Sequence, residues 1–189
     1  ILLGDAPCIR EESLLDLFEA HEKAEADLTV LSVNHSNPFN YGRILREGER
    51  VIGIREHRDC TPEELLISEI NSGVFLLNTD RLKEYLPKLS NDNAQGEYYI
   101  TDLLELMSAD GLKVRAHLIS DETELIGINN RSQLWDVTQV MQRRINQKWL
   151  VEGVTMISPD TIFIDADVTL SPDVTIYPGT HLRGKTKVA

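Results

Sequence analysis

IFIDADVTLSPDVTIYPGTHLRGKTKV, residues 162–188, repeats its pattern every six residues. Aliphatic residues return at this interval in one column, and a second column of aliphatic and threonine residues runs beside it. A six-residue repeat predicts a parallel β-helix, in which each coil buries its aliphatic column only against the next coil. The columns are Ile164, Leu170, Ile176, Leu182 and Val188, and Ile162, Val168, Val174, Thr180 and Thr186.

One long helix is expected just before this repeat, over residues 132–152. Apolar residues recur there three or four positions apart, and charged residues leave one flank polar. The apolar positions are Leu134, Val137, Met141, Ile145 and Trp149.

The remaining part, residues 1–131, alternates short apolar runs with amphipathic segments. Such alternation predicts an α/β domain with a mostly parallel sheet. Residues 61–64 also carry a capping box, which predicts a helix start. Strands are expected at residues 1–3, 28–33, 43–46, 51–55, 69–77 and 113–119, with helices at 14–24, from 61, from 79 and at 97–107.

Composition excludes several classes of function. The net charge of −12 and pI near 4.8 argue against a nucleic-acid-binding face and against docking on anionic membranes. No apolar run approaches the ~20 residues of a membrane helix. The two cysteines, Cys8 and Cys60, have no metal-ligand spacing and are expected to be free thiols in a reducing cytosol. An acidic protein that handles phosphate must recruit cations, which makes a metal ion plausible.

Two polar residues follow expected strands and could share a metal. Asp5 comes after the run 1–3, and a carboxylate at the carboxyl end of a strand faces the ligand crevice of open α/β sheets. Asn129 closes another short strand. Carboxylate and amide oxygens suit Mg²⁺, and Gly4 would let a substrate approach the backbone. Alternatively, Asp5 and Pro7 are simply turn residues.

Residues 47–49, Glu-Gly-Glu, lie between the expected strands 43–46 and 51–55 and predict a hairpin. Three further candidates lie around it. Gly42 could expose a backbone amide to a ligand or serve a turn with positive φ. Glu56 could accept from two sugar hydroxyls or belong to a surface charge cluster. Asn71 offers a donor and an acceptor, or else marks a strand-edge bulge with Gly73.

The string SNDNAQGEYYITD, residues 90–102, is the most specific in the chain. It is a polar loop running into an expected helix start, where free backbone amides and tyrosine rings could meet a sugar. On physical grounds alone it is a capped loop. Tyr99 and Thr101 are its candidate ligand-binding residues.

These strings, in this order, resemble the bacterial bifunctional N-acetylglucosamine-1-phosphate uridyltransferase and glucosamine-1-phosphate acetyltransferase family over essentially the whole chain. The resemblance implies a partial nucleotidyltransferase domain at residues 1–131, with a Rossmann-like mixed sheet, and a linker helix at 132–152. It also implies the first coils of a left-handed parallel β-helix at 153–189.

The resemblance also implies site roles. Asp5 and Asn129 would bind Mg²⁺, and Asn129 would also touch the nucleotide sugar. Gly42, Glu56 and Asn71 would hold UDP-N-acetylglucosamine, mostly at its sugar, while Tyr99 and Thr101 would line the sugar pocket.

The implied reaction joins UTP and N-acetylglucosamine 1-phosphate and releases pyrophosphate. The parent protein would also use acetyl-CoA, form a homotrimer and work in the cytoplasm. The family's nucleotide loop lies upstream of Ile1 and its acetyltransferase site in later coils, so these 189 residues alone are expected to be inactive. Leu3 also replaces the family's usual tyrosine, and Arg58 a common lysine.

Two other functions fit the same features. The chain could come from another sugar-1-phosphate nucleotidyltransferase with a β-helix tail, such as one that makes ADP-glucose or a deoxythymidine diphosphate sugar. It could also be a non-catalytic scaffolding subunit whose coils drive trimerisation.

Overall fold

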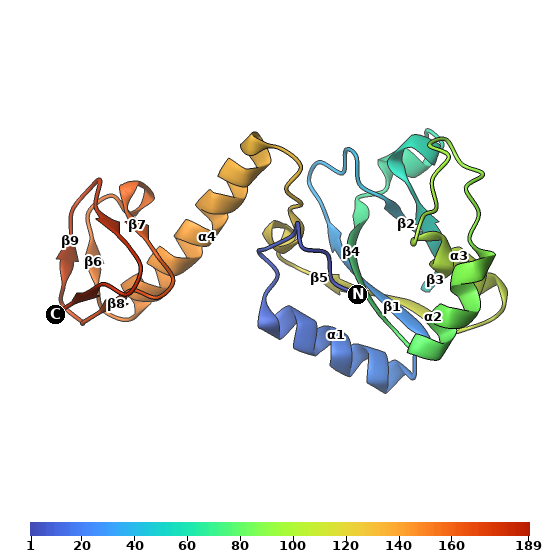
Figure 1. Cartoon of the computed structure of the whole chain (residues 1–189), viewed down its shortest axis with the longest axis horizontal. Helices are drawn as coiled ribbons and strands as arrows, with labels where there is room; N and C mark the ends of the chain where they lie inside the picture. The colour runs from blue at the N-terminus through green and yellow to red at the C-terminus, as the bar shows by residue number, and fades with distance from the viewer. The chain divides into compact units, whose positions relative to one another are not determined.

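The computed structural model describes residues 1–189 as two compact units, Ile1–Leu125 and Ile126–Ala189. Figure 1 shows an α/β unit and a unit made of one long helix and short strands. None of the helices is both long and apolar enough to cross a membrane.

A five-stranded sheet forms the centre of the first unit, in the order β3-β2-β4-β1-β5. Only β1 and β5 pair in parallel, whereas β1 with β4, β4 with β2 and β2 with β3 are antiparallel. The expectation of a mostly parallel sheet is therefore wrong, and the expectation of a mixed sheet is confirmed. The hairpin of β2 and β3 was expected, and the pairings that differ are those of β4, which runs antiparallel to both β1 and β2. The strands are β1 (Leu28–Asn34), β2 (Arg43–Glu47), β3 (Arg50–Arg55), β4 (Glu69–Leu77) and β5 (Val114–Ile119).

Helices cover both faces of this sheet (Figure 1). On β1, Leu28 and Val30 face a core with α2 (Thr79–Tyr85) and α3 (Asp102–Ala109). The alternate residues Leu31 and Val33 pack with Leu17 of α1 (Glu11–Ala24) on the other face. This two-residue alternation is what a strand buried on both faces requires.

Two elements differ from the sequence-based expectations. Residues 1–3 form no strand and are about half exposed, although the Ile1 carbonyl accepts from Phe75 N–H at 3.0 Å. The capping box forms, with Thr61 N–H donating to Glu64 Oε2 at 2.8 Å and Glu64 N–H donating to Thr61 Oγ1 at 3.2 Å. It starts only one 3₁₀ turn. The 3₁₀ turns are η1 (His57–Asp59), η2 (Glu64–Leu66), η3 (Leu86–Lys88), η4 (Glu122–Leu125) and η5 (Pro159–Thr161).

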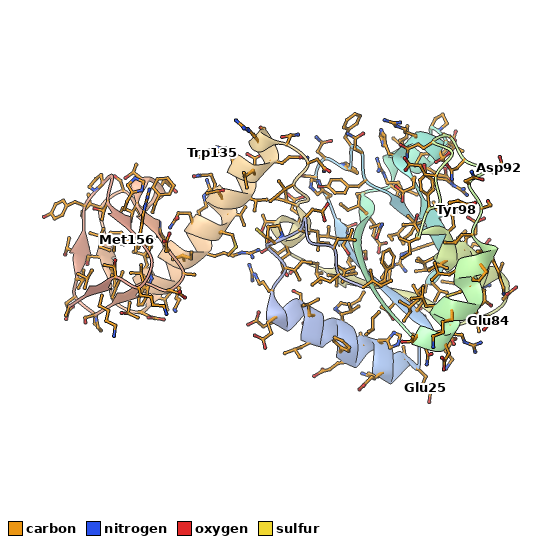
Figure 2. All side chains as sticks on the ribbon, in the orientation of Figure 1. Glu25, Glu84, Asp92, Tyr98, Trp135 and Met156 are labelled. Carbon is orange, nitrogen blue, oxygen red and sulfur yellow. The ribbon has the colours of Figure 1, made fainter.

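The second unit begins with the expected long helix, α4 (Arg131–Val151). Asn130 caps it by accepting from Gln133 N–H at 3.0 Å. Near its end Trp149 is buried against the coils, whose core includes Met156, whereas Trp135 near its start is exposed (Figure 2).

Six two-residue strands follow and pair in parallel, β6 with β9, β7 with β10 and β8 with β11. Phe163 lies opposite His181 and Thr169 opposite Lys187, a separation of 18 residues in each case. Because 18 is three repeats of six, this is the register of a β-helix coil with three faces, and the repeat-based prediction is confirmed. The strands are β6 (Thr155–Met156), β7 (Phe163–Ile164), β8 (Thr169–Leu170), β9 (Thr175–Ile176), β10 (His181–Leu182) and β11 (Lys187–Val188).

Replacing Leu104 by alanine should destabilise the first unit by about 2–5 kcal/mol, because its side chain is completely buried and its loss leaves a cavity. Leu66→Ala is the matched control, since Leu66 is 86% exposed and should change stability by about 0.5 kcal/mol or less. Urea unfolding followed by circular dichroism measures both, and equal effects would contradict this core assignment.

Candidate functional site

Strand pairing brings three of the predicted ligand-binding residues together at one end of the sheet. Arg43, the first residue of β2, lies opposite Arg55 on β3 and Ile70 on β4. Gly42, Glu56 and Asn71 are the next residues along at this junction, and Asn71 N–H donates to the Gly42 carbonyl at 2.9 Å.

Gly42 is required here by close packing. A β-carbon at this position would lie 2.8 Å from Ile54 Cγ2 and 3.3 and 3.4 Å from the two carboxylate oxygens of Glu56. Its backbone does not have a positive φ, so the alternative of a left-handed turn is wrong. The glycine therefore makes room for the Glu56 carboxylate.

Glu56 is held in place and is not part of a surface charge cluster. Its side chain is partly buried, and Oε1 accepts a hydrogen bond from Thr101 Oγ1 at 2.9 Å. Thr101 itself is only 4% exposed. Two of the predicted site residues, 45 positions apart in the sequence, are thus in direct contact.

Asn71 begins the bulge that was the alternative prediction for this segment. The pairing of β1 with β4 changes register between Val30 and Ser32, opposite the stretch around Gly73, whose φ is +76°. Asn71 Oδ1 accepts from Gly73 N–H at 2.8 Å. The bulge uses the side-chain acceptor and leaves the amide N–H donors of Asn71 for a ligand.

An open cavity of about 260 Å³ lies beside this junction. Glu56 and Tyr99 both line it, whereas Gly42, Asn71 and Thr101 do not. The lining is rich in hydrogen-bond acceptors, because Asp59 and Asp102 line it together with Glu56. Two positively charged side chains also line it. These cations are Arg55 and Lys88.

The loop before α3 forms one side of the cavity, and Figure 2 shows Asp92 and Tyr98 on it. Asn93 closes the loop on itself, because its Oδ1 accepts from the N–H groups of Gln95 and Glu97. These turns keep residues 97–101 out of the helix, so α3 starts at Asp102 and the expected start at residue 97 is wrong. The Tyr99 hydroxyl accepts from Gln95 Nε2 at 2.6 Å, which fixes the ring.

The electrostatics of the cavity favour ligands that donate hydrogen bonds. Burial raises the pKa of Glu56, and the nearby Asp102 and Asp59 raise it further, while the Thr101 hydrogen bond lowers it. Burial also raises the pKa of Asp102, with Glu105 adding to the effect. Ligand hydroxyl or amide N–H groups would relieve this crowding of negative charge.

The predicted metal pair is divided between the two units. Asp5 lies in an exposed turn of the first unit, next to Gly4, where an added β-carbon would meet nothing within 4 Å. Asn129 is an exposed residue of the second unit, and its backbone N–H donates to Gln133 Oε1 at 2.8 Å. No group of three or more His, Cys, Asp or Glu residues is arranged to hold a metal. Each of the two residues offers an oxygen donor of the kind that Mg²⁺ accepts.

Sequence reasoning missed two residues of the site. Asp59 ties η1 to the loop, since its Oδ1 accepts from Ala94 N–H at 2.8 Å, and its buried Oδ2 has no partner. Arg43 is only 2% exposed, donates to the Tyr41 carbonyl and faces His57 Nδ1 at 3.5 Å. Charged residues in a polar stretch give no signal of burial, so neither position could be identified from the pattern.

Comparison with known proteins identifies relatives of the whole chain. The chain is 43% identical over its whole length to bifunctional protein GlmU of Clostridium novyi (strain NT), and it covers 41% of that protein. It is 44% identical to bifunctional protein GlmU of Clostridioides difficile (strain 630), again over the whole chain and 41% of the relative. Its relatives are the bifunctional GlmU proteins. The resemblance found in the sequence is therefore confirmed, and the chain spans about two fifths of the length of the GlmU proteins it matches.

A solved structure has a similar fold over most of the chain. The CMP:2-keto-3-deoxy-manno-octonic acid synthetase complexed with CTP has a TM-score of 0.52 and 14% identity, over 76% of this chain and 61% of that one. At this identity the likeness concerns the fold alone. No protein-family model matches the chain.

Gly42→Ala should destabilise the first unit by about 1–3 kcal/mol, because the new methyl group must displace Ile54 and crowd the Glu56 carboxylate. Gly4→Ala is the control, since that position has open space and no positive φ, and it should be neutral or slightly stabilising. Thermal unfolding by calorimetry measures both. A Gly42→Ala protein as stable as the Gly4→Ala protein would show that the packing around Glu56 is loose.

Proposed function

We propose that the chain provides the sugar-binding side of a site that makes UDP-N-acetylglucosamine from UTP and N-acetylglucosamine 1-phosphate. The supporting observation is the convergence of Gly42, Glu56 and Asn71 at one junction of the sheet, beside a cavity lined by acceptors. The similarity to GlmU over the whole chain supports the same proposal.

The groups at this junction match the chemistry of an acetylated amino sugar. Sugar hydroxyls are donors that Glu56 Oε2 can accept. The Asn71 amide N–H groups can donate to an acceptor such as the acetamido carbonyl. The Tyr99 ring, fixed by Gln95, can lie against the apolar face of the sugar. Each group thereby has a counterpart on the ligand.

The proposed reaction is attack by the sugar phosphate on the α-phosphorus of UTP, with pyrophosphate as the leaving group. Phosphoryl transfer of this kind depends on positioning and charge neutralisation. Residues of this chain would hold the sugar and so direct its phosphate towards the nucleotide, with Gly4 allowing close approach to the backbone. Asp5 and Asn129 would hold the Mg²⁺, which offsets repulsion between phosphate oxygens when it is bound.

Further properties are proposed for the protein that contains this chain. By resemblance it uses acetyl-CoA to acetylate glucosamine 1-phosphate, forms a homotrimer through its left-handed β-helix and works in the cytoplasm. Nucleic acids and membranes are not among its proposed partners, consistent with the net charge of −12.

Glu56→Gln should weaken binding of N-acetylglucosamine 1-phosphate about 10- to 100-fold, because a charged acceptor contributes more to a hydrogen bond than a neutral one. Glu49→Gln, at the exposed hairpin turn, is the control and should bind like the wild type. Isothermal titration calorimetry measures the affinities, and unchanged binding by Glu56→Gln would refute the role of this carboxylate.

The 189-residue chain, incubated with UTP, Mg²⁺ and the sugar phosphate, should release no pyrophosphate above background. The resemblance places the nucleotide-binding loop outside these residues, so the α-phosphorus would not be positioned for attack. A coupled pyrophosphate assay tests this, with a full-length GlmU protein as the positive control. Robust turnover by the chain alone would overturn the proposal that these residues provide only the sugar-binding side of the site.

A further inference from the structure

Thr101 occupies the position of a helix cap but does not act as one. It immediately precedes α3, where a threonine side chain normally accepts from a backbone N–H of the first turn. Here its side chain makes no capping bond, and its hydroxyl donates to Glu56 Oε1 at 2.9 Å instead. Its backbone is in the right-handed helical region (φ −65°, ψ −24°) and not in the extended region typical of a capping residue, so the hydroxyl bonds to Glu56 and not to the helix start.

We propose that Thr101 is a positioning residue, which fixes the Glu56 carboxylate so that Oε2 is the acceptor presented to the ligand. This inference rests on the proposed sugar-binding function of Glu56 and gives Thr101 a role other than direct contact. Thr101 is almost fully buried, at 4% exposed, whereas Glu56 lines the cavity.

Two neighbours restrict the carboxylate together. Gly42, the residue before β2, comes so close that a β-carbon built there would lie 3.3 and 3.4 Å from the two oxygens, and Thr101 holds Oε1 from the residue before α3. Glu56 also lines the cavity, where a ligand could reach its carboxylate. A carboxylate fixed in this way loses little side-chain entropy when a ligand binds, so its hydrogen bonds contribute more to affinity.

The hydroxyl also opposes protonation of Glu56. The ionisable groups around Glu56 come from three segments. Asp59 lies in η1 and Cys60 follows it, Tyr99 and Asp102 lie around the start of α3, and Arg55 is the last residue of β3. Burial and the two aspartates raise the pKa of Glu56, and the Thr101 hydrogen bond lowers it. A protonated Glu56 would lose acceptor capacity, so Thr101 maintains the form that binds hydroxyls.

The first test needs no ligand. In the free 189-residue chain, with ¹³C-labelled glutamate, the side-chain carboxyl of Glu56 is titrated by NMR. Thr101→Val removes the donor and should shift the titration midpoint to higher pH, while Thr101→Ser keeps the hydroxyl and should leave it unchanged. Thermal unfolding checks that both variants are folded. An unchanged midpoint in folded Thr101→Val would overturn the inference.

The second test is calorimetric titration with N-acetylglucosamine 1-phosphate across pH. Thr101→Val should bind about tenfold more weakly than the wild type at neutral pH. As the pH is lowered, the variant should lose affinity first, because its Glu56 becomes protonated at a higher pH. Thr101→Ser should restore the affinity. Wild-type affinity in Thr101→Val would overturn the inference. If the NMR shift occurs but the wild type shows no saturable binding, the proposed function itself fails.

Discussion

The backbone pairing at Arg43 is the constraint on which the site depends. This one residue of β2 lies opposite both Arg55 and Ile70, and the Asn71 N–H to Gly42 carbonyl bond follows directly from that register. Because side chains alternate between the faces of a sheet, a slip of one residue would turn the neighbouring side chains to the opposite face. The sequence pattern predicted the hairpin of β2 and β3 but not the antiparallel pairing of β4 with β2, and the two pairings together bring the proposed sugar-binding residues to one junction.

The site balances burial against charge. Glu56 is partly removed from water beside Asp59 and Asp102, which disfavours its ionised form, and the Thr101 hydroxyl compensates in part. Such a group is costly to maintain without a ligand and gains most from ligand donors. The same physical reasoning explains why a glycine stands at position 42, since any side chain there would enter the space of the carboxylate. Packing and electrostatics thus both favour a ligand that donates hydrogen bonds to Glu56.

Periodic parts of the fold were predictable from the sequence, and parts determined by tertiary contacts were not. The six-residue columns around Ile164 and Leu170 predicted coils, and the parallel register 18 residues apart confirms them. The run 1–3 looked like a buried strand because it is apolar, but it pairs only through Ile1 beside the β4 bulge. The start of α3 was misplaced because the Asn93 turns, which no periodicity reveals, take up the preceding residues. Individual site residues came from the family resemblance, whereas the Thr101–Glu56 contact required coordinates.

The most direct measurement of the central claim is backbone amide chemical-shift mapping of the 189-residue chain during titration with UDP-N-acetylglucosamine and Mg²⁺. The account predicts saturable changes concentrated at Gly42, Glu56, Asn71 and Tyr99, with the core amides of Leu31 and Val33 unaffected. Changes confined to α1 or to the β-helix coils, with none at the junction around Arg43, would contradict it.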